Sequence, residues 1–214
     1  MSSPKQSSDR SALSRLFLGR GDTTPPAHPM AVFSLSSVRV YVERGVLVWV
    51  ALAVVFCAAA AYIESWTLIG WGAGAAIGAG WLVSFFGAGI IHELGHVLVL
   101  RHYGLRTTWA QIGLTGAAVH TPGSLGPPEL VWVFMAGPVA NLVAGAPVAL
   151  IMIFAVGSSP PLALGFVAWS WIVIHLGLFV FNLVPAGVTD GAQAFRAARG
   201  TGKAPSPGGA EVVL

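Results

Sequence analysis

The chain has 214 residues, of which 55% are hydrophobic and only 9% are charged, and its formal net charge at pH 7 is +3. With a mean hydropathy of +0.76, this composition excludes an ordinary soluble domain and indicates a protein that lies in a lipid bilayer. The basic residues do not cluster with aromatic side chains on a polar face, so no binding to nucleic acid is expected. The single cysteine, Cys57, excludes an intrachain disulfide.

The N-terminal segment, residues 1–37, is expected to be a flexible cytoplasmic tail. Residues 1–29 are rich in Ser, Pro and charged side chains, which offer little apolar surface to bury. Met30 is an alternative start, and residues 38–42 alternate like a short strand. A cleaved signal peptide is disfavoured because a long charged region precedes the first apolar stretch, so that stretch is interpreted as an uncleaved anchor.

Four apolar stretches follow, at about residues 45–63, 71–100, 130–156 and 161–186. Each stretch reaches the ~20 residues that a helix needs to cross ~30 Å of hydrocarbon. None shows the two-residue alternation of a membrane barrel, and a helix satisfies its own backbone hydrogen bonds in lipid. The expected fold class is therefore an all-α membrane protein, a bundle of about four transmembrane helices.

The eleven Lys and Arg residues predict the orientation of this bundle. Six precede the first stretch, two follow the second and three follow the fourth, whereas the other two loops have none. By the positive-inside rule, both termini and the loop at 101–129 are expected to be cytoplasmic. The expected location is a cell membrane of bacterial type. The loops near Glu64 and at 157–161 are then on the outside.

The loop at 104–128 is too apolar for an ordinary solvated loop. Its β-branched residues and glycines, around 107–112, predict a small hairpin that is cytoplasmic or re-entrant. Beyond Phe195 the chain is rich in Gly and Pro, so residues 201–214 are expected to form a flexible C-terminal tail. One membrane-embedded domain, residues 38–200, remains between the two tails.

The second apolar stretch contains the pentad His92-Glu93-Leu94-Gly95-His96. Two histidines four residues apart lie about 40° apart around a helix axis, one turn along it, and can converge on one ion. This is the spacing of zinc ligands, and Glu93 is then the general base that takes a proton from an activated water. An ionisable side chain in a spanning helix costs on the order of 2–3 kcal/mol or more, which favours a functional interpretation over an accidental match.

A catalytic zinc ion usually has three protein ligands and one open position. Asp190 is the only acid between Glu129 and Glu211, so it is the candidate third ligand. Breaks at Pro185, Gly187 and Gly191 are expected to end the helix and let the carboxylate turn back towards the ion. The alternative is a solvated Asp-Gly turn.

Three motifs together resemble the site-2 protease family of intramembrane zinc metalloproteases, over about residues 38–200. They are the His92–His96 pentad, the Gly137–Asn141 motif and the segment Asn182–Gly191. Val188 departs from the family pattern, which usually has proline there, and Ala192 stands where a second glycine is frequent. The resemblance implies the compact form of the family, with no appended soluble domain.

The resemblance also implies the roles of individual residues. One zinc ion per chain would be held by His92, His96 and Asp190, with Glu93 as the base. Asn141 and Asn182 would lie near the active centre and position the substrate backbone or the developing oxyanion. From the residues alone, a hydrogen bond between helices is also an adequate explanation of each asparagine. The implied substrate is a membrane-spanning protein or peptide, cut by regulated intramembrane proteolysis, and residues 107–119 would supply a strand that holds it extended.

Three further histidines need an interpretation. His175 lies seven residues before Asn182, on nearly the same helical face. It could form a hydrogen bond to a residue that holds a metal ligand, contact the substrate helix, or serve only in packing. His102 and His120 are expected at the surface of the cytoplasmic loop. Three tryptophans are expected to be interfacial anchors: Trp66, Trp71 and Trp109.

Three other functions compete with the protease hypothesis. The first is a catalytically silent protein that binds membrane helices and keeps a structural metal, but such a site has no need of a base like Glu93. The second is a membrane zincin whose third ligand is a glutamate, but residues 130–210 contain no glutamate. The third is a transporter, for which the sequence offers no continuous polar path across the bilayer.

Overall fold

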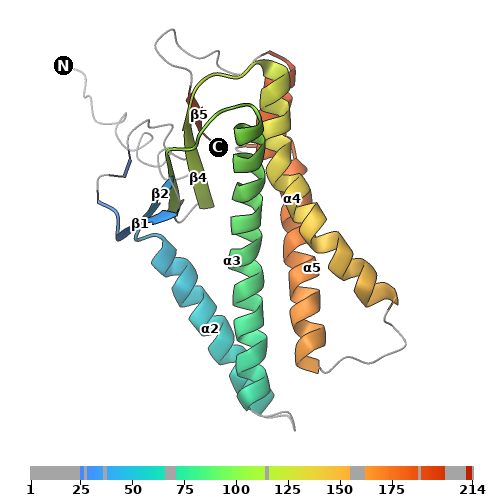
Figure 1. Cartoon of the computed structure of the whole chain (residues 1–214). Coiled ribbons are helices and arrows are strands. Elements are labelled where there is room, and N and C mark those ends of the chain that lie inside the picture. The colour runs from blue at the N-terminus through green and yellow to red at the C-terminus, as the bar shows by residue number, and fades with distance from the viewer. Residues whose placement is uncertain are drawn as a thin grey trace, which may run out of the picture.

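The computed structural model describes residues 25–26, 28–35, 38–65, 71–113, 116–154, 162–187, 189–200 and 211–213. Figure 1 shows long helices with a small sheet near one end. The helices are α2 (Val46–Ser65), α3 (Trp71–His102), α4 (Pro127–Phe154), α5 (Leu162–Leu183) and α6 (Asp190–Ala198). The strands are β1 (Ala31–Leu35), β2 (Val38–Val42), β3 (Trp109–Gly113), β4 (Gly116–Pro122) and β5 (Glu211–Val213).

Three helices in the described part of the chain are long and apolar enough to cross a membrane: Ile77–His102, Pro127–Phe154 and Leu164–Leu183. They correspond to three of the four predicted spans, and the chain is an integral membrane protein. The first predicted span corresponds to α2, whose 20 residues make a helix about 30 Å long at 1.5 Å per residue. Its crossing of the bilayer stays a prediction.

Helix α3 is central, because α2, α4 and α5 all pack against it, while α6 packs against α4 and α5. Small residues set the helix separations. A Cβ atom on Gly95 of α3 would lie 2.5 Å from the carbonyl oxygen of Ala136 on α4, so only glycine permits this approach. Lipid tails are as apolar as the helix surfaces, so close packing through small residues is a main source of helix association in a membrane.

The strands form one sheet in the order β1-β2-β3-β4-β5, in which β2 and β3 are parallel and the other neighbours are antiparallel. The predicted strand at 38–42 and the predicted hairpin are confirmed as β2 and as the β3–β4 pair. The prediction of flexible tails is corrected for two short segments, since residues 31–35 and 211–213 are paired strands. Each adds backbone hydrogen bonds to a sheet edge that would otherwise lack them. Residues 1–24 and 201–210 lie outside the described residues, and the proposed domain limits stay a prediction.

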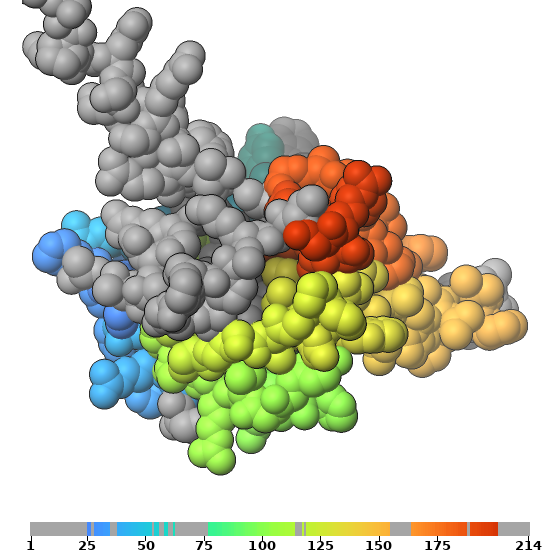
Figure 2. Space-filling view, turned by 90° about the horizontal axis from the view of Figure 1, so that it is seen from above, coloured from blue at the N-terminus to red at the C-terminus, as the bar shows by residue number. Residues whose placement is uncertain are grey.

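The sheet lies beside the end of the bundle where α2 begins and α3 ends (Figure 1), since β2 leads into α2 and β3 follows α3. A small core joins it to the helices: Leu100 of α3, Val119 of β4 and Val133 of α4 are buried against one another. The start of α4 and helix α6 lie at the same end. Figure 2, seen from above that end, shows α6 beside the start of α4.

Two side chains of the loop were expected at a surface or interface, and both expectations are wrong. His120 is 8% exposed and Trp109 is 9% exposed. Their rings stack with centroids 4.9 Å apart and an interplanar angle of 6°, because the β3–β4 register sets them opposite each other. His102 is exposed, as expected. Trp66 and the side chain of Trp71 lie outside the described residues.

Candidate metal centre

His92 and His96 lie one turn apart on α3 and face the interior of the bundle. His92 is 9% exposed and His96 is 1% exposed. Their Nε2 atoms are 3.2 Å apart, and their rings meet at 81°. The expected convergence of an i, i+4 pair is therefore present.

The chain turns between α5 and α6, and this turn carries Asp190 to the histidines. Helix α5 ends at Leu183, shortly before Pro185, and Gly187 has a φ of 65°. Thr189 caps α6: its Oγ1 contacts the carbonyls of Val184 and Ala186 and accepts a hydrogen bond from Ala192 N at 3.3 Å. These contacts fix the direction in which α6 leaves the turn.

One expected helix breaker behaves differently. Gly191 does not end a helix but lies in the first turn of α6. A Cβ atom at this position would lie 2.4 Å from the carbonyl oxygen of Leu183. The missing side chain thus lets the start of α6 press against the end of α5, and the cap at Thr189 supports the helix despite the poor helix propensity of glycine.

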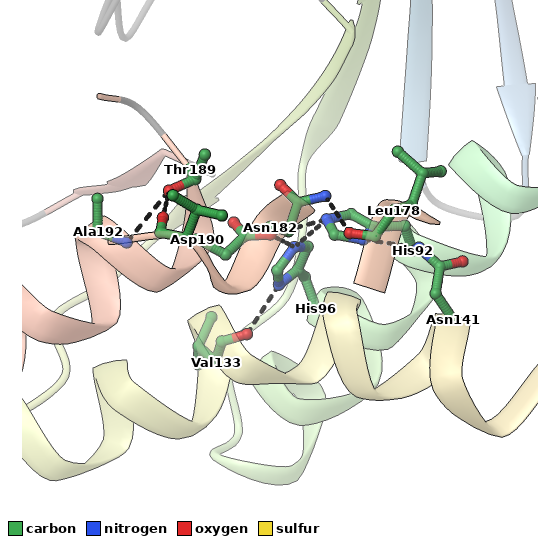
Figure 3. A network of polar contacts seen from close by, with 10 residues as sticks. His92, His96, Val133, Asn141, Leu178, Asn182, Thr189, Asp190 and Ala192 are labelled. Carbon is green, nitrogen blue, oxygen red and sulfur yellow. Dashed lines mark hydrogen bonds and ion pairs between the residues drawn. The ribbon is translucent and has the colours of Figure 1, made fainter. Parts of the chain in front are cut away.

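Asp190 is 7% exposed, and its Oδ2 lies 2.9 Å from His92 Nε2 and 3.6 Å from His96 Nε2. Figure 3 shows the three side chains pointing towards one another from α3 and α6. Burial by itself raises the pKa of the Asp190 carboxyl, but the two histidine rings outweigh burial and hold that pKa below its ordinary value. A carboxyl group binds a metal as the ionised carboxylate, so this direction suits Asp190 for a ligand role.

The three atoms fit a divalent metal such as zinc. Their separations are 2.9, 3.2 and 3.6 Å, and ligand atoms of a tetrahedral zinc site are about 3.3–3.5 Å apart when metal–ligand distances are about 2.0–2.1 Å. Gly137 of α4 lines the same space: a Cβ atom there would lie 2.4 Å from His96 Nε2 and 2.6 Å from His92 Nε2. The group can thus hold one metal ion.

The outer nitrogen of each histidine ring also has a partner. His96 Nδ1 donates to the carbonyl of Val133 at 2.7 Å, and His92 Nδ1 lies 3.1 Å from the side-chain amide nitrogen of Asn141. Partners of this kind fix the ring orientation of metal-binding histidines. Both rings are therefore held with Nε2 towards Asp190.

Glu93 directly follows His92 and interacts electrostatically with both histidines and with Asp190. Its Oε2 atom is buried and has no hydrogen-bond partner among the described residues. A buried carboxylate oxygen without a partner is costly in a protein that serves only as a scaffold. Glu129 Oε2, in the first turn of α4, is also buried without a partner among the described residues, so the feature that makes Glu93 the candidate base is its place beside the three candidate ligands.

The two asparagines differ in position. Asn141 is fully buried on α4 and contacts His92, so it lies at the centre. Asn182 is half-buried and donates to the carbonyl of Leu178 in its own helix at 3.1 Å. This hydrogen bond stays within α5 and does not reach the histidines. The roles of both asparagines stay predictions.

Sequence reasoning missed two parts of the site and left a third open. The Val133 carbonyl is a backbone group, which no side-chain pattern reveals. Gly137 was seen only as part of a motif, and its contact with both histidine rings needed the packing of α4 on α3. For His175 the sequence allows several roles, and the structure shows it fully buried, with Nδ1 3.0 Å from Asn141 Oδ1.

Gly137→Ala is expected to lower zinc content strongly, because the added methyl group would occupy the space beside the two Nε2 atoms. The matched control is Gly177→Ala on α5, where a Cβ atom meets nothing within 4 Å. Metal analysis of the two purified variants checks the prediction. Equal zinc content in both variants would contradict the assigned packing.

Comparisons with known proteins agree with this geometry. The chain is 30% identical over 122 residues to Rip3 of Mycobacterium tuberculosis, strains Erdman and H37Rv, which is provisionally named as a zinc metalloprotease. The match covers 56% of this chain and 31% of Rip3, so the chain spans about a third of the length of these relatives. No family model matches the chain.

A solved structure, the site-2 protease from Methanocaldococcus jannaschii, has a similar fold. The TM-score is 0.56 at 18% sequence identity, and the likeness covers 82% of this chain and 74% of the other. This likeness concerns the fold alone. Together with the Rip3 match, it confirms the resemblance to the site-2 protease family.

Proposed function

We propose that this chain is an intramembrane zinc metalloprotease, which hydrolyses peptide bonds in or near the transmembrane segments of membrane proteins. The observation that carries the proposal is the meeting of His92 and His96 from α3 with Asp190 from α6, beside Glu93. The provisional name of Rip3 and the fold of the archaeal site-2 protease support it.

His92, His96 and Asp190 would hold one zinc ion per chain. Zinc supplies Lewis acidity, which makes water a nucleophile at neutral pH and polarises a carbonyl group. Glu93 would accept the proton of the attacking water and pass it to the leaving amine, as a general base and then a general acid. Asn141 and Asn182 are the candidates for positioning the substrate backbone.

The small sheet offers a place for an extended substrate. A transmembrane helix hides its peptide bonds, so a substrate must be unwound before attack, and an extended segment can pair with a sheet edge. Only His120–Pro122 of β4 pair with β5, so the outer edge of Gly116–Val119 has no partner among the described strands. This edge is the proposed docking position.

The proposed orientation in the membrane has both termini and the metal centre on the cytoplasmic side. His96 is five residues, about 7 Å along the helix, from Arg101, which places the centre near that face. In a Cys57→Ala background, a cysteine at Ser159 should react with an impermeant thiol reagent only from outside. A cysteine at Ser124 should react only from the cytoplasm. Labelling of the Ser159 cysteine from the cytoplasm would contradict the four-span arrangement.

The protease activity itself is tested with purified protein in detergent or lipid and a panel of single-span peptides. Cleavage is expected in or near the spanning segment, should stop with a zinc chelator and should return with added zinc. Fragment sequencing locates the bond. A zinc-loaded protein that binds such peptides and cuts none would support a catalytically silent helix-binding protein instead.

A further inference from the structure

A line of polar side chains runs from the metal centre into the packed interface of α4 and α5. His92 Nδ1 lies 3.1 Å from Asn141 Nδ2, and Asn141 Oδ1 lies 3.0 Å from His175 Nδ1. Asn141 and His175 are both 0% exposed. Figure 3 shows Asn141 on α4 reaching towards His92.

His175 is costly to keep at this position. It lies in the spanning part of α5, where an ionisable side chain is expensive and by default functional. Its Nε2 is buried and has no hydrogen-bond partner among the described residues. The two helices approach closely here, because a Cβ atom on Gly145 of α4 would lie only 3.0 Å from His175 Cβ. A packing role alone would be better filled by an apolar residue.

We infer that His175 is a positioning residue that acts through Asn141 to hold His92 in the ring form that offers Nε2 to a metal. This inference rests on the proposed metal-binding role of His92. It assigns to His175 no contact with substrate or metal.

The ring form follows from the geometry of the centre. His92 Nε2 is the atom that faces Asp190 and His96, so it is the ligand atom. A neutral histidine that binds through Nε2 carries its proton on Nδ1, and that N–H must donate to an oxygen. The Asn141 atom that faces His92 must then be Oδ1.

The need for Asn141 Oδ1 to face His92 also determines which atom of Asn141 faces His175. The oxygen and nitrogen of an amide occupy nearly equivalent positions, so turning the Asn141 amide by 180° keeps both contacts and exchanges their donor and acceptor roles. The amide nitrogen then donates to His175 Nδ1, which accepts only when the His175 proton is on Nε2. With His175 Nδ1 as an acceptor, the Asn141 amide is held with its oxygen towards His92, as metal binding through His92 Nε2 requires.

The test measures zinc affinity by competition with a chelator of known affinity, for the full chain in detergent. Loss of a partner behind a metal-binding histidine typically costs 10–100-fold in metal affinity, so His175→Leu should weaken zinc binding by about 10-fold. His175→Asn should stay close to the wild type, because its amide can place an acceptor near the position of Nδ1. Leucine and asparagine have similar shapes, so the two variants differ mainly in polarity.

A second comparison separates the positioning of His92 by His175 from a general weakening of the packing between α4 and α5. Trp171, one turn away on α5, donates to the Ala144 carbonyl of α4 at 2.9 Å. The Trp171 ring also packs on the His175 ring, with centroids 4.2 Å apart. Trp171→Phe removes the hydrogen bond between the two helices but keeps an aromatic ring beside His175, so it should leave zinc affinity unchanged. Equal losses for Trp171→Phe and His175→Leu, or a His175→Asn variant as weak as His175→Leu, would overturn the inference.

The coupling to Asn141 is tested by a double variant. If His175 acts through Asn141, His175→Leu should add no further loss of zinc affinity to Asn141→Leu. Additive losses would overturn the inference. Should the leucine variants fail to fold, nitrogen NMR of the histidine rings in the zinc-loaded wild type decides: a His175 proton on Nδ1 contradicts the inference, and one on Nε2 supports it.

The two proposals fail in different ways. A wild-type protein that binds no zinc would refute the metal centre itself. Zinc binding by the wild type that is indifferent to His175→Leu would refute only the role of His175.

Discussion

Glu93→Gln is expected to leave zinc bound while peptide cleavage falls by at least 10²–10⁴-fold, the usual contribution of general acid–base catalysis. Glutamine keeps the size and the hydrogen-bonding capacity of the side chain, but it cannot accept a proton. The three candidate ligand atoms belong to other residues, so the metal should remain. Metal analysis and a cleavage assay on the same preparation check both halves of the prediction.

The control for this variant is Glu129→Gln, which makes the same chemical change in the first turn of α4. It should retain both zinc and cleavage. Cleavage at the wild-type rate by a zinc-loaded Glu93→Gln protein would refute Glu93 as the base. Loss of zinc together with activity would instead indicate that Glu93 is a ligand.

Asp190→Asn is expected to lose zinc and therefore all cleavage. The substitution removes the negative charge that faces two neutral histidines, and a neutral amide is a poor zinc ligand. The loss of zinc affinity should exceed the 10–100-fold that typically follows from removing a residue that is hydrogen-bonded to a metal ligand. Competition with a chelator measures it, and Gln193→Glu on the same helix is a useful companion because it alters charge without changing any of the three candidate ligands.

Unchanged zinc affinity in Asp190→Asn would contradict the ligand assignment. Addition of excess zinc offers a further check, since a weakened site should regain part of its occupancy and cleavage at high zinc concentration. A variant that binds zinc normally but does not cut would show that Asp190 serves catalysis in another way.

The membrane class, the helical form and the pair of histidines can all be predicted from the amino-acid sequence. Spans and helices follow from local rules, because an apolar run of about 20 residues in lipid must satisfy its backbone internally. The His92–His96 pair also needs only local geometry, since helix periodicity alone brings residues four apart onto one face. Asp190 is predictable as a ligand because it is the only acid between Glu129 and Glu211.

The contacts between segments that are distant in the sequence depend on the three-dimensional packing. The sheet pairs residues 39–42 with 109–112 and residues 211–213 with 120–122, and backbone pairing of this kind leaves little signal in short segments. The burial of His120 and Trp109 depends on the register of β3 and β4. Gly137, the Val133 carbonyl and the contact of His175 with Asn141 all require α4 to pack on α3 and α5 in one particular rotation. The chemical type of each side chain can be read from the sequence. The partners of that side chain depend on long-range packing, which no local pattern specifies.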